Sequence, residues 1–224
     1  MCGFAGYLSE HKLERASDIL MKMGQTILHR GPDDSGIWMD AEAGIGLSHQ
    51  RLAVIDVSAA GHQPMISPSG RYVIAFNGEI YNHLQIRRDL GSEYQWRGHS
   101  DTETLLAAFD VWGIEVSLKK SIGMFAFALW DRQERSLTLG RDRIGEKPLY
   151  YGWQNGTFLF SSELKALKAH PAFRASIDRN ALTLLMRHSC IPAPYSIYEN
   201  IHKLPPGSFL KVSLKNREPQ PEYY

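Results

Sequence analysis

The sequence predicts an α+β fold with two mainly antiparallel sheets, and three observations lead to that prediction. Short apolar segments follow one another with turn-forming residues between them, which is typical of strands joined by hairpins. Segments with helical periodicity occur in separate groups and do not alternate with the strands, which argues against a parallel α/β sheet. The 224 residues, of which 43% are hydrophobic, are enough to fill the core of one large layered domain.

The first part of the chain predicts several strands and one helix. Residues 4–8 form an apolar run close behind the N-terminus, and apolar residues at helical spacing from 16 to 28 predict about four turns of amphipathic helix. Turn-forming residues dominate 30–36 (RGPDDSG) and the longer loop 58–70. We expect further short strands at residues 36–39, 46–49, 52–55 and 72–76.

The second part of the chain predicts a helix followed by a dense group of strands. The helix covers residues 100–112 and opens with a capping box formed by Ser100 and Glu103. Asn155-Gly156, between two apolar runs, is a strong hairpin signal. We expect strands at residues 125–130, 137–140, 149–153, 158–161 and 208–214, and helices at 163–169 and 178–187.

Composition and charge argue against several classes of protein. The formal net charge is +1, with 25 basic and 24 acidic residues and no long basic run, so nucleic acid and an anionic membrane surface are not expected partners. The longest strongly apolar stretch, residues 124–130, is far too short to span a bilayer. Two cysteines far apart, Cys2 and Cys190, without an N-terminal signal-type segment predict a cytoplasmic protein.

Position 2 gives Cys2 a chemical meaning that an arbitrary cysteine lacks. An isolated cysteine is most often a small buried hydrophobe. Aminopeptidases remove Met1 when the next side chain is small, however, and the chain would then begin with a thiol and a free α-amino group on one residue. The amine titrates near about 7.7–8.0 and the thiol near about 8.5, so the amine is matched to act as general base for the thiol. We therefore expect Cys2 to be an N-terminal nucleophile.

Asn77 and Gly78 are candidate donors for an oxyanion hole, which acyl transfer from an amide requires. They follow the apolar run 72–76, and Asn-Gly after such a run is usually a hairpin turn. Residues 79–90 do not alternate like a returning strand, and their spacing suits a helix or an irregular segment better.

Arg51 and Asp101 are candidates for holding the two charged ends of an amino acid. The planar guanidinium of Arg51 suits a carboxylate, although a structural ion pair is the commoner fate of a single arginine. Asp101 occupies the first helical position after the Ser100 cap, where it could accept an ammonium group or interact with the helix dipole.

Taken together, these residues resemble the class II glutamine amidotransferases, and among them the N-terminal glutaminase domain of asparagine synthetases. The similarity extends from Met1 to residues 204–207. It is carried by residues 1–6 (MCGFAG), 29–33 (HRGPD), 50–52 (QRL) with Asp56, 76–82 (FNGEIYN), 100–103 (SDTE), 140–151 (GRDRIGEKPLYY) and 161–167 (SSELKAL).

The resemblance implies a four-layer αββα fold of the N-terminal-nucleophile hydrolase type. It implies that Cys2 attacks the glutamine amide, that Asn77 and the Gly78 N–H stabilise the oxyanion, and that Arg51 binds the α-carboxylate. Asp101 and Glu79 would hold the α-ammonium group. Val54 and Ile55 would contribute backbone contacts. Glutamine hydrolysis would need no metal and no cofactor.

Asparagine synthetases continue into an ATP-using domain with a Ser-Gly-Gly-x-Asp-Ser loop, and neither this loop nor a P-loop occurs here. We therefore expect residues 1–214 to be the glutaminase domain and residues 215–224 to begin a linker to an absent synthetase domain, which would bind ATP and Mg²⁺. That domain would be the partner that uses the ammonia, with aspartate as the default acceptor.

Several alternatives stay open at this stage. The chain could be a catalytically silent regulatory or interaction domain. It could instead serve an amidotransferase whose acceptor is a sugar or secondary-metabolite carboxylate. A metal-binding protein is a weaker alternative, because no His or Cys pair shows the usual ligand spacing. A homodimer is also compatible with the sequence.

Overall fold

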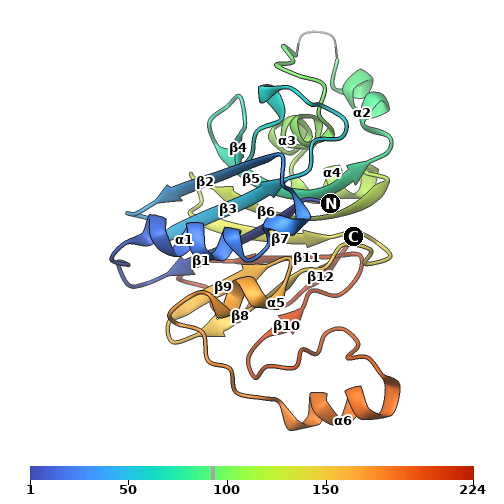
Figure 1. Ribbon diagram of the computed structural model, residues 1–224. Coiled ribbons are helices and arrows are strands. Elements are labelled where there is room, and N and C mark those ends of the chain that lie inside the picture. Colours follow the sequence, from blue (N-terminus) through green and yellow to red (C-terminus); the bar gives the residue numbers. More distant parts are fainter. Residues whose placement is uncertain (92–93) are drawn as a thin grey trace.

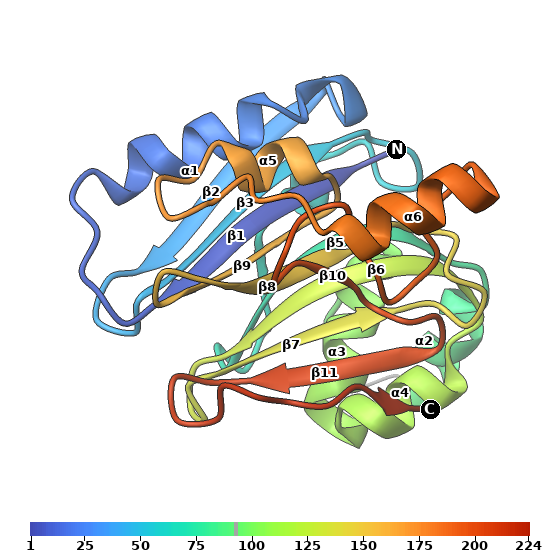
Figure 2. The ribbon, with the colours of Figure 1, turned by 90° about the horizontal axis from the view of Figure 1, so that it is seen from below.

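Two six-stranded antiparallel sheets face each other, and helices cover the outer face of each (Figures 1 and 2). This architecture is taken from a computed structural model that describes residues 1–91 and 94–224. The predicted α+β class and the αββα order of layers are confirmed. Figure 2 shows the layers in sequence, with α1 and α5 on one side and α3 and α4 on the other.

The first sheet has the strand order β10-β8-β9-β1-β3-β2. Its strands are β1 (Gly3–Ser9), β2 (Asp34–Asp40), β3 (Ile45–Arg51), β8 (Tyr150–Gln154), β9 (Thr157–Ser161) and β10 (His202–Lys203). The N-terminal strand β1 is central and pairs with β3 on one side and β9 on the other. The predicted Asn155-Gly156 turn joins β8 to β9, and both residues have a positive φ, as a type I′ hairpin requires.

The second sheet has the strand order β12-β11-β7-β6-β5-β4. Its strands are β4 (Met65–Ile66), β5 (Tyr72–Ile80), β6 (Gly123–Asp131), β7 (Ser136–Arg141), β11 (Ser208–Val212) and β12 (Glu222–Tyr223). Strand β12 pairs with β11, so the folded body extends beyond residue 214. The expectation of a linker to a second domain stays a prediction.

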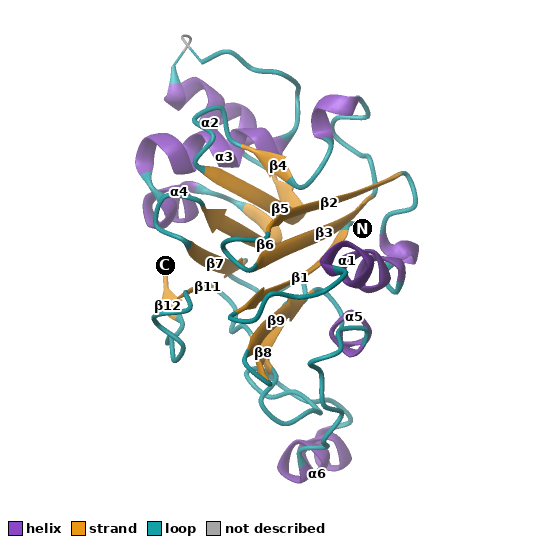
Figure 3. Cartoon of the chain, turned by 90° about the vertical axis from the view of Figure 1, so that its left-hand side faces the viewer, coloured by secondary structure: helices purple, strands orange, loops and turns teal. Residues whose placement is uncertain are grey.

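The helices form two groups and one separate element. Helices α1 (Ala16–Gln25) and α5 (Leu164–Lys168) cover the first sheet, and α2 (His83–Leu90), α3 (Asp101–Trp112) and α4 (Ile114–Lys120) lie beside the second. Short 3-10 turns occur at Leu28–Arg30 and Ala59–Gly61. Helix α6 (Arg179–His188), capped by Asp178, projects away from the layers (Figure 3).

Three apolar clusters fill the spaces between the layers. The largest lies between the two sheets and includes Phe4, Leu47, Val73 and Trp130, all at most 1% exposed. The second lies between the other face of the β5–β6 sheet and α3, and the third lies between the β1 sheet and α1 and α5. Two fully packed sheets fix the strand ends that carry the candidate site.

The structure corrects four details of the sequence prediction. Residues 52–55 are a loop and not a strand, because β1 begins at Gly3 and offers no partner beyond Gln50, while Val54 is 67% exposed. The first helix ends at Gln25, well before residue 28. Strand β2 begins at Asp34, inside the expected loop 30–36. Helix α4 and the two-residue strands β4, β10 and β12 were not predicted, because such short elements show no periodicity.

The expected capping box at α3 is only half formed. Ser100 Oγ accepts a hydrogen bond from the Glu103 N–H at 3.2 Å, as predicted. The Glu103 carboxylate does not return to Ser100, but accepts hydrogen bonds from the N–H groups of Arg97 and Gly98. The glutamate therefore orders the chain before the helix.

Candidate active site

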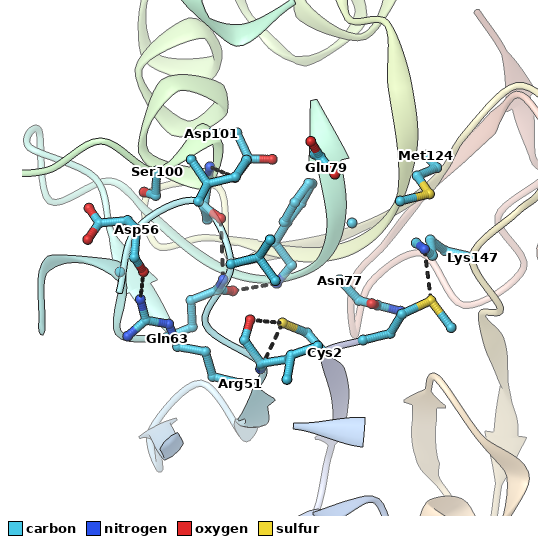
Figure 4. A pocket seen from close by; sticks show the side chains of 18 residues that line it. Cys2, Arg51, Asp56, Gln63, Asn77, Glu79, Ser100, Asp101, Met124 and Lys147 are labelled. Atoms are coloured by element: carbon cyan, nitrogen blue, oxygen red, sulfur yellow. Dashed lines mark hydrogen bonds between the residues drawn. The ribbon is translucent and has the colours of Figure 1, made fainter. Parts of the chain in front are cut away.

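One pocket contains all eight residues that the sequence singled out: Cys2, Arg51, Val54, Ile55, Asn77, Gly78, Glu79 and Asp101. They come from both sheets, from the loop after β3 and from the N-terminus of α3. Figure 4 shows the labelled side chains arranged around this cavity. A hydrogen bond links the two sheets beside the pocket: the Nε2 of His49, in β3, donates to the carbonyl oxygen of Phe76, in β5, at 2.9 Å.

Cys2 lies at the start of β1, beside the end of β3. Its Sγ accepts a hydrogen bond from the Leu52 N–H at 3.3 Å and lies 3.5 Å from the Leu52 carbonyl oxygen. Burial raises the pKa of the Cys2 thiol, although the Leu52 N–H and the positive charges of the N-terminus and Arg51 oppose this effect. The sulfur is therefore protonated at neutral pH and needs a base to become a nucleophile.

Met1 is present in this structure and lines the same pocket. It is 60% exposed, and its Sδ lies 2.9 Å from the Lys147 Nζ. While Met1 is attached, the nitrogen of Cys2 is an amide and cannot act as a base.

Arg51 is held in place by backbone carbonyl groups. Its guanidinium donates to the carbonyl oxygens of Ser58, at 3.0 Å, and Asp56. The carboxylate oxygen Oδ2 of Asp34 lies 3.8 Å from Nη1 of Arg51. A Cβ at Gly61 would overlap the Arg51 guanidinium, so a larger residue there would displace the guanidinium. Arg51 thus presents a fixed positive charge at one end of the pocket.

Asn77 and Gly78 lie within β5 and not in a turn. Both pair with β6, opposite Ala126 and Phe125. The side-chain amide of Asn77 is buried, and neither its nitrogen nor its oxygen has a hydrogen-bond partner among the described residues. A buried amide without a partner is costly in an apolar setting, and a ligand in the pocket would satisfy it.

Asp101 and Glu79 supply negative charge to the pocket. Asp101 accepts hydrogen bonds from the Ile80 N–H at 2.8 Å and the Thr102 N–H at 3.0 Å, and its side chain is almost fully buried. Burial raises the pKa of Asp101 to about 6, and the nearby charge of Glu79 adds to this. Asp101 is therefore charged at neutral pH, in a setting that favours a cation as partner.

The loop after β3 closes the pocket between Arg51 and α3. Val54 and Ile55 line it, followed by Asp56. The Asp56 carboxylate accepts hydrogen bonds from Ser58 and from the His99 N–H at 2.7 Å, and the pKa of Asp56 falls to about 2, mainly through its bond with the Ser58 side chain. Asp56 thereby ties this loop to the segment before α3.

Sequence reasoning missed three side chains around the pocket. Gln63 accepts from the Phe76 N–H at 2.7 Å and donates to Thr102 Oγ at 3.3 Å, so it joins β5 to α3. His49 holds the carbonyl oxygen of the same Phe76, and burial lowers the pKa of His49 to about 4, which keeps it neutral. Lys147 lines the pocket and is 4% exposed. Of these three residues, only Lys147 lies in one of the motifs that carry the resemblance, and the sequence assigned no role to it.

The described residues offer neither a cluster of metal ligands nor a membrane-spanning helix. Within residues 1–91 and 94–224, no group of three or more His, Cys, Asp or Glu side chains could hold a metal ion. The same residues contain no helix that is long and apolar enough to cross a membrane.

Comparison with known proteins establishes the family. The family model described as "Glutamine amidotransferase domain" matches residues 1–224, the whole chain. The chain belongs to this family. It is a class II glutamine amidotransferase domain of the asparagine synthetase type, as the sequence motifs predicted.

Curated relatives of this amidotransferase domain are named as asparagine synthetases. A putative glutamine-hydrolysing asparagine synthetase 2 of Methanocaldococcus jannaschii is 36% identical over 242 aligned positions, which cover 100% of this chain and 46% of the relative. The glutamine-hydrolysing asparagine synthetase 1 of Bacillus subtilis is 38% identical over 93% of this chain and 33% of its own length. The domain thus spans about a third to a half of these relatives.

The solved structures support the fold of this amidotransferase domain. The glutamine phosphoribosylpyrophosphate amidotransferase of B. subtilis matches with a TM-score of 0.70 over 98% of this chain and 49% of that chain. The identity is 20%, so this likeness concerns the fold alone.

Proposed function

We propose that this domain hydrolyses the side-chain amide of L-glutamine to glutamate and ammonia, with the Cys2 thiol as nucleophile. The observation that carries the proposal is the pocket itself. It unites a thiol, a fixed guanidinium, a buried unpartnered amide and a buried carboxylate, which together match the chemistry of a free amino acid that ends in a carboxamide.

Binding uses the charges at the two ends of the substrate. The Arg51 guanidinium pairs with the α-carboxylate, and Asp101 with Glu79 holds the α-ammonium group. Val54 and Ile55 supply backbone contacts from the loop after β3. Charges of both signs at fixed positions select an amino acid over an amide that lacks either end.

Removal of Met1 creates the base. The new α-amino group takes the proton of the Cys2 thiol, and the sulfur attacks the carboxamide carbon. The side-chain N–H of Asn77 and the backbone N–H of Gly78 stabilise the oxyanion of the tetrahedral intermediate.

The intermediate collapses when the same amine, now protonated, gives its proton to the departing nitrogen. Ammonia leaves and a glutamyl thioester remains on Cys2. A water molecule, deprotonated by the amine, attacks the thioester, and glutamate is released with the thiol restored. Protons balance over the cycle, and no cofactor is required.

We expect the binding site of the ammonia acceptor in the part of the relatives that this chain does not span, which is more than half of their length. We propose that the domain supplies ammonia to an ATP-dependent amidation with aspartate as the acceptor, because the matched relatives are named asparagine synthetases.

The test compares wild type with Cys2→Ala and with Cys190→Ala as a matched control, because Cys190 is exposed and does not line the pocket. We expect Cys2→Ala to lower ammonia release from glutamine at least about a thousandfold, as loss of a nucleophile does in other hydrolases. Cys190→Ala should stay active. Equal ammonia release from Cys2→Ala and wild type would overturn the proposal.

The same samples test the processing step. The intact mass of active protein should lack one methionine, since the free amine is part of the mechanism. A fully active species that retains Met1 would contradict the assigned base.

A further inference from the structure

The loop of residues 142–147 is held rigidly at the edge of the pocket. The Asp142 carboxylate accepts hydrogen bonds from five backbone N–H groups, those of Phe125, Ile144, Gly145, Glu146 and Lys147. The Arg141 guanidinium donates to the carbonyl oxygens of Gly145, Lys147 and Leu204. Both amide groups that flank the Lys147 Cα are therefore fixed, and neither contact involves Met1.

Lys147 carries a buried positive charge without a carboxylate partner. Its side chain lines the pocket, and the residue is 4% exposed. Among the described residues, the only hydrogen-bond partner of its ammonium group is the thioether sulfur of Met1. A thioether is a weak acceptor and carries no charge. Buried lysines are normally paired, so an unpaired one at a pocket points to a function for the charge itself.

The other charged groups near Cys2 differ from Lys147 in this respect. Arg30 donates to the Cys2 carbonyl oxygen at 2.9 Å, but it is paired with Glu163 at 2.9 Å. Arg51 has Asp34 nearby and the substrate carboxylate as its proposed partner. The anionic groups that line the pocket are Asp56, Glu79 and Asp101.

None of these three anions forms an ion pair with Lys147 among the described residues. Asp56 is bound to Ser58 and to the His99 N–H, and Asp101 with Glu79 is assigned to the substrate ammonium. Among the described residues, Lys147 is thus the side-chain cation of this pocket whose charge is not balanced by a carboxylate.

We propose that the Lys147 ammonium keeps the α-amino group of mature Cys2 in its uncharged, basic form. This inference rests on the proposed function. Met1 connects the two groups, because its backbone is joined to the Cys2 nitrogen and its sulfur touches Lys147. After Met1 is removed, the new amino group and the lysine face the same space, and a nearby like charge disfavours protonation of the amine.

The kinetic test measures the pH profile of kcat/KM for ammonia release. We expect Lys147→Met to move the acidic limb to higher pH by about one unit, so that turnover below the limb falls about tenfold while the rate at high pH is kept. Lys147→Arg retains the charge and should keep the wild-type limb. Lys168→Met removes an exposed lysine outside the pocket and serves as control. An unchanged acidic limb in Lys147→Met would overturn the inference.

A second measurement does not depend on activity. In Cys2→Ala the small second residue still permits removal of Met1, and the thiol no longer competes for reagents. The rate of acetylation of the N-terminal amine, followed by mass spectrometry against pH, should rise at lower pH in Cys2→Ala than in Cys2→Ala/Lys147→Met. If the N-terminal amine titrates identically in the two proteins, the role of Lys147 is refuted. If the wild-type protein releases no ammonia from glutamine, only the proposed function is refuted.

If Lys147→Met fails to fold, a peptide with the sequence of residues 2–7, carrying the same Cys2→Ala change, becomes the reference. The amine of the folded Cys2→Ala protein should then titrate below that of the peptide. Titration at or above the peptide would contradict the inference.

Discussion

Asn77 illustrates how a single side chain in this pocket is prepared for a ligand. Its position in β5 is fixed through the preceding residue, because Phe76 is held by Gln63 at its N–H and by His49 at its carbonyl oxygen. Its own amide has no partner among the residues described. The surrounding hydrogen bonds therefore hold in place an amide that stays available to a ligand, and in the proposed reaction this ligand is the oxyanion.

Asn77→Ala should lower kcat for glutamine hydrolysis by about 10²–10³-fold, the usual effect of removing one oxyanion donor. KM should change little, because the donor acts mainly on the transition state. Steady-state kinetics of ammonia release measure both values. A large rise in KM with unchanged kcat would assign Asn77 to substrate binding instead.

Asp101 should make substrate binding depend on pH. Burial raises its pKa to about 6, so its carboxylate is charged above that pH and neutral below it. A neutral Asp101 cannot pair with the substrate ammonium, so KM for glutamine should rise as pH falls through about 6.

Asp101→Asn removes the charge at every pH and should raise KM at neutral pH by about tenfold or more, in line with loss of a charge-assisted hydrogen bond. The KM of this variant should no longer respond to pH in the range near 6. A variant whose KM follows pH as wild type does would show that another group titrates.

At the scale of elements, the site is formed where strand ends and loops meet. Arg141 and Asp142 at the end of β7 illustrate this, because they order the whole loop that carries Lys147. Asp178 plays a simpler role, since it only caps α6 through the N–H groups of Asn180 and Ala181.

Asp142→Ala should lower the free energy of unfolding by about 3 kcal/mol or more, because it leaves the buried N–H groups of Phe125 and Lys147 without partners, together with three partly buried ones. Asp178→Ala, the matched control, should lower the free energy of unfolding by only about 1 kcal/mol, as loss of a helix cap does. Urea unfolding measures both. Equal effects of the two changes would contradict the structural role given to Asp142.

Elements with clear periodicity or turn chemistry were predictable from the sequence, and α3 and the β8–β9 hairpin are examples. The Asn77-Gly78 pair was harder, because the same dipeptide ends many strands in a turn, whereas here β5 continues to Ile80. Its pairing with β6 decides this, and a Cβ at Gly78 would overlap Met124 and Phe125.

The prediction of a strand at residues 52–55 fails for a related reason. Apolar residues without alternation can line a pocket as well as a strand interior, and the missing neighbour strand becomes visible only in three dimensions. The eight candidate residues lie in or beside motifs that are recognisable in the sequence, and the fold places them in one pocket. The charge environment of Lys147 was not predictable in this way, because it depends on contacts with segments that are distant in the sequence, such as Met1.

At the scale of the whole molecule, the pocket is supported by two packed sheets. The chain spans only about a third to a half of the length of the curated relatives. Neither a Ser-Gly-Gly-x-Asp-Ser loop nor a P-loop occurs in its 224 residues. The glutaminase half-reaction and the use of ammonia are therefore separable in the proposed function.

The 224-residue protein should release one ammonia for each glutamate and form no asparagine when ATP, Mg²⁺ and aspartate are added. Coupled enzymatic assays of glutamate and ammonia, with amino acid analysis for asparagine, measure this. Asparagine formation that depends on ATP would show that the acceptor site lies within these residues.

The central claim is that the sulfur of mature Cys2 becomes acylated by glutamine. The most direct test mixes the protein with glutamine, stops the reaction in acid during turnover and determines the mass of the N-terminal peptide. We expect a peptide that begins at Cys2 and is heavier by the mass of glutamine minus ammonia, with no such adduct in Cys2→Ala. Ammonia release at the wild-type rate with no adduct on Cys2, or with the adduct on another residue, would contradict it.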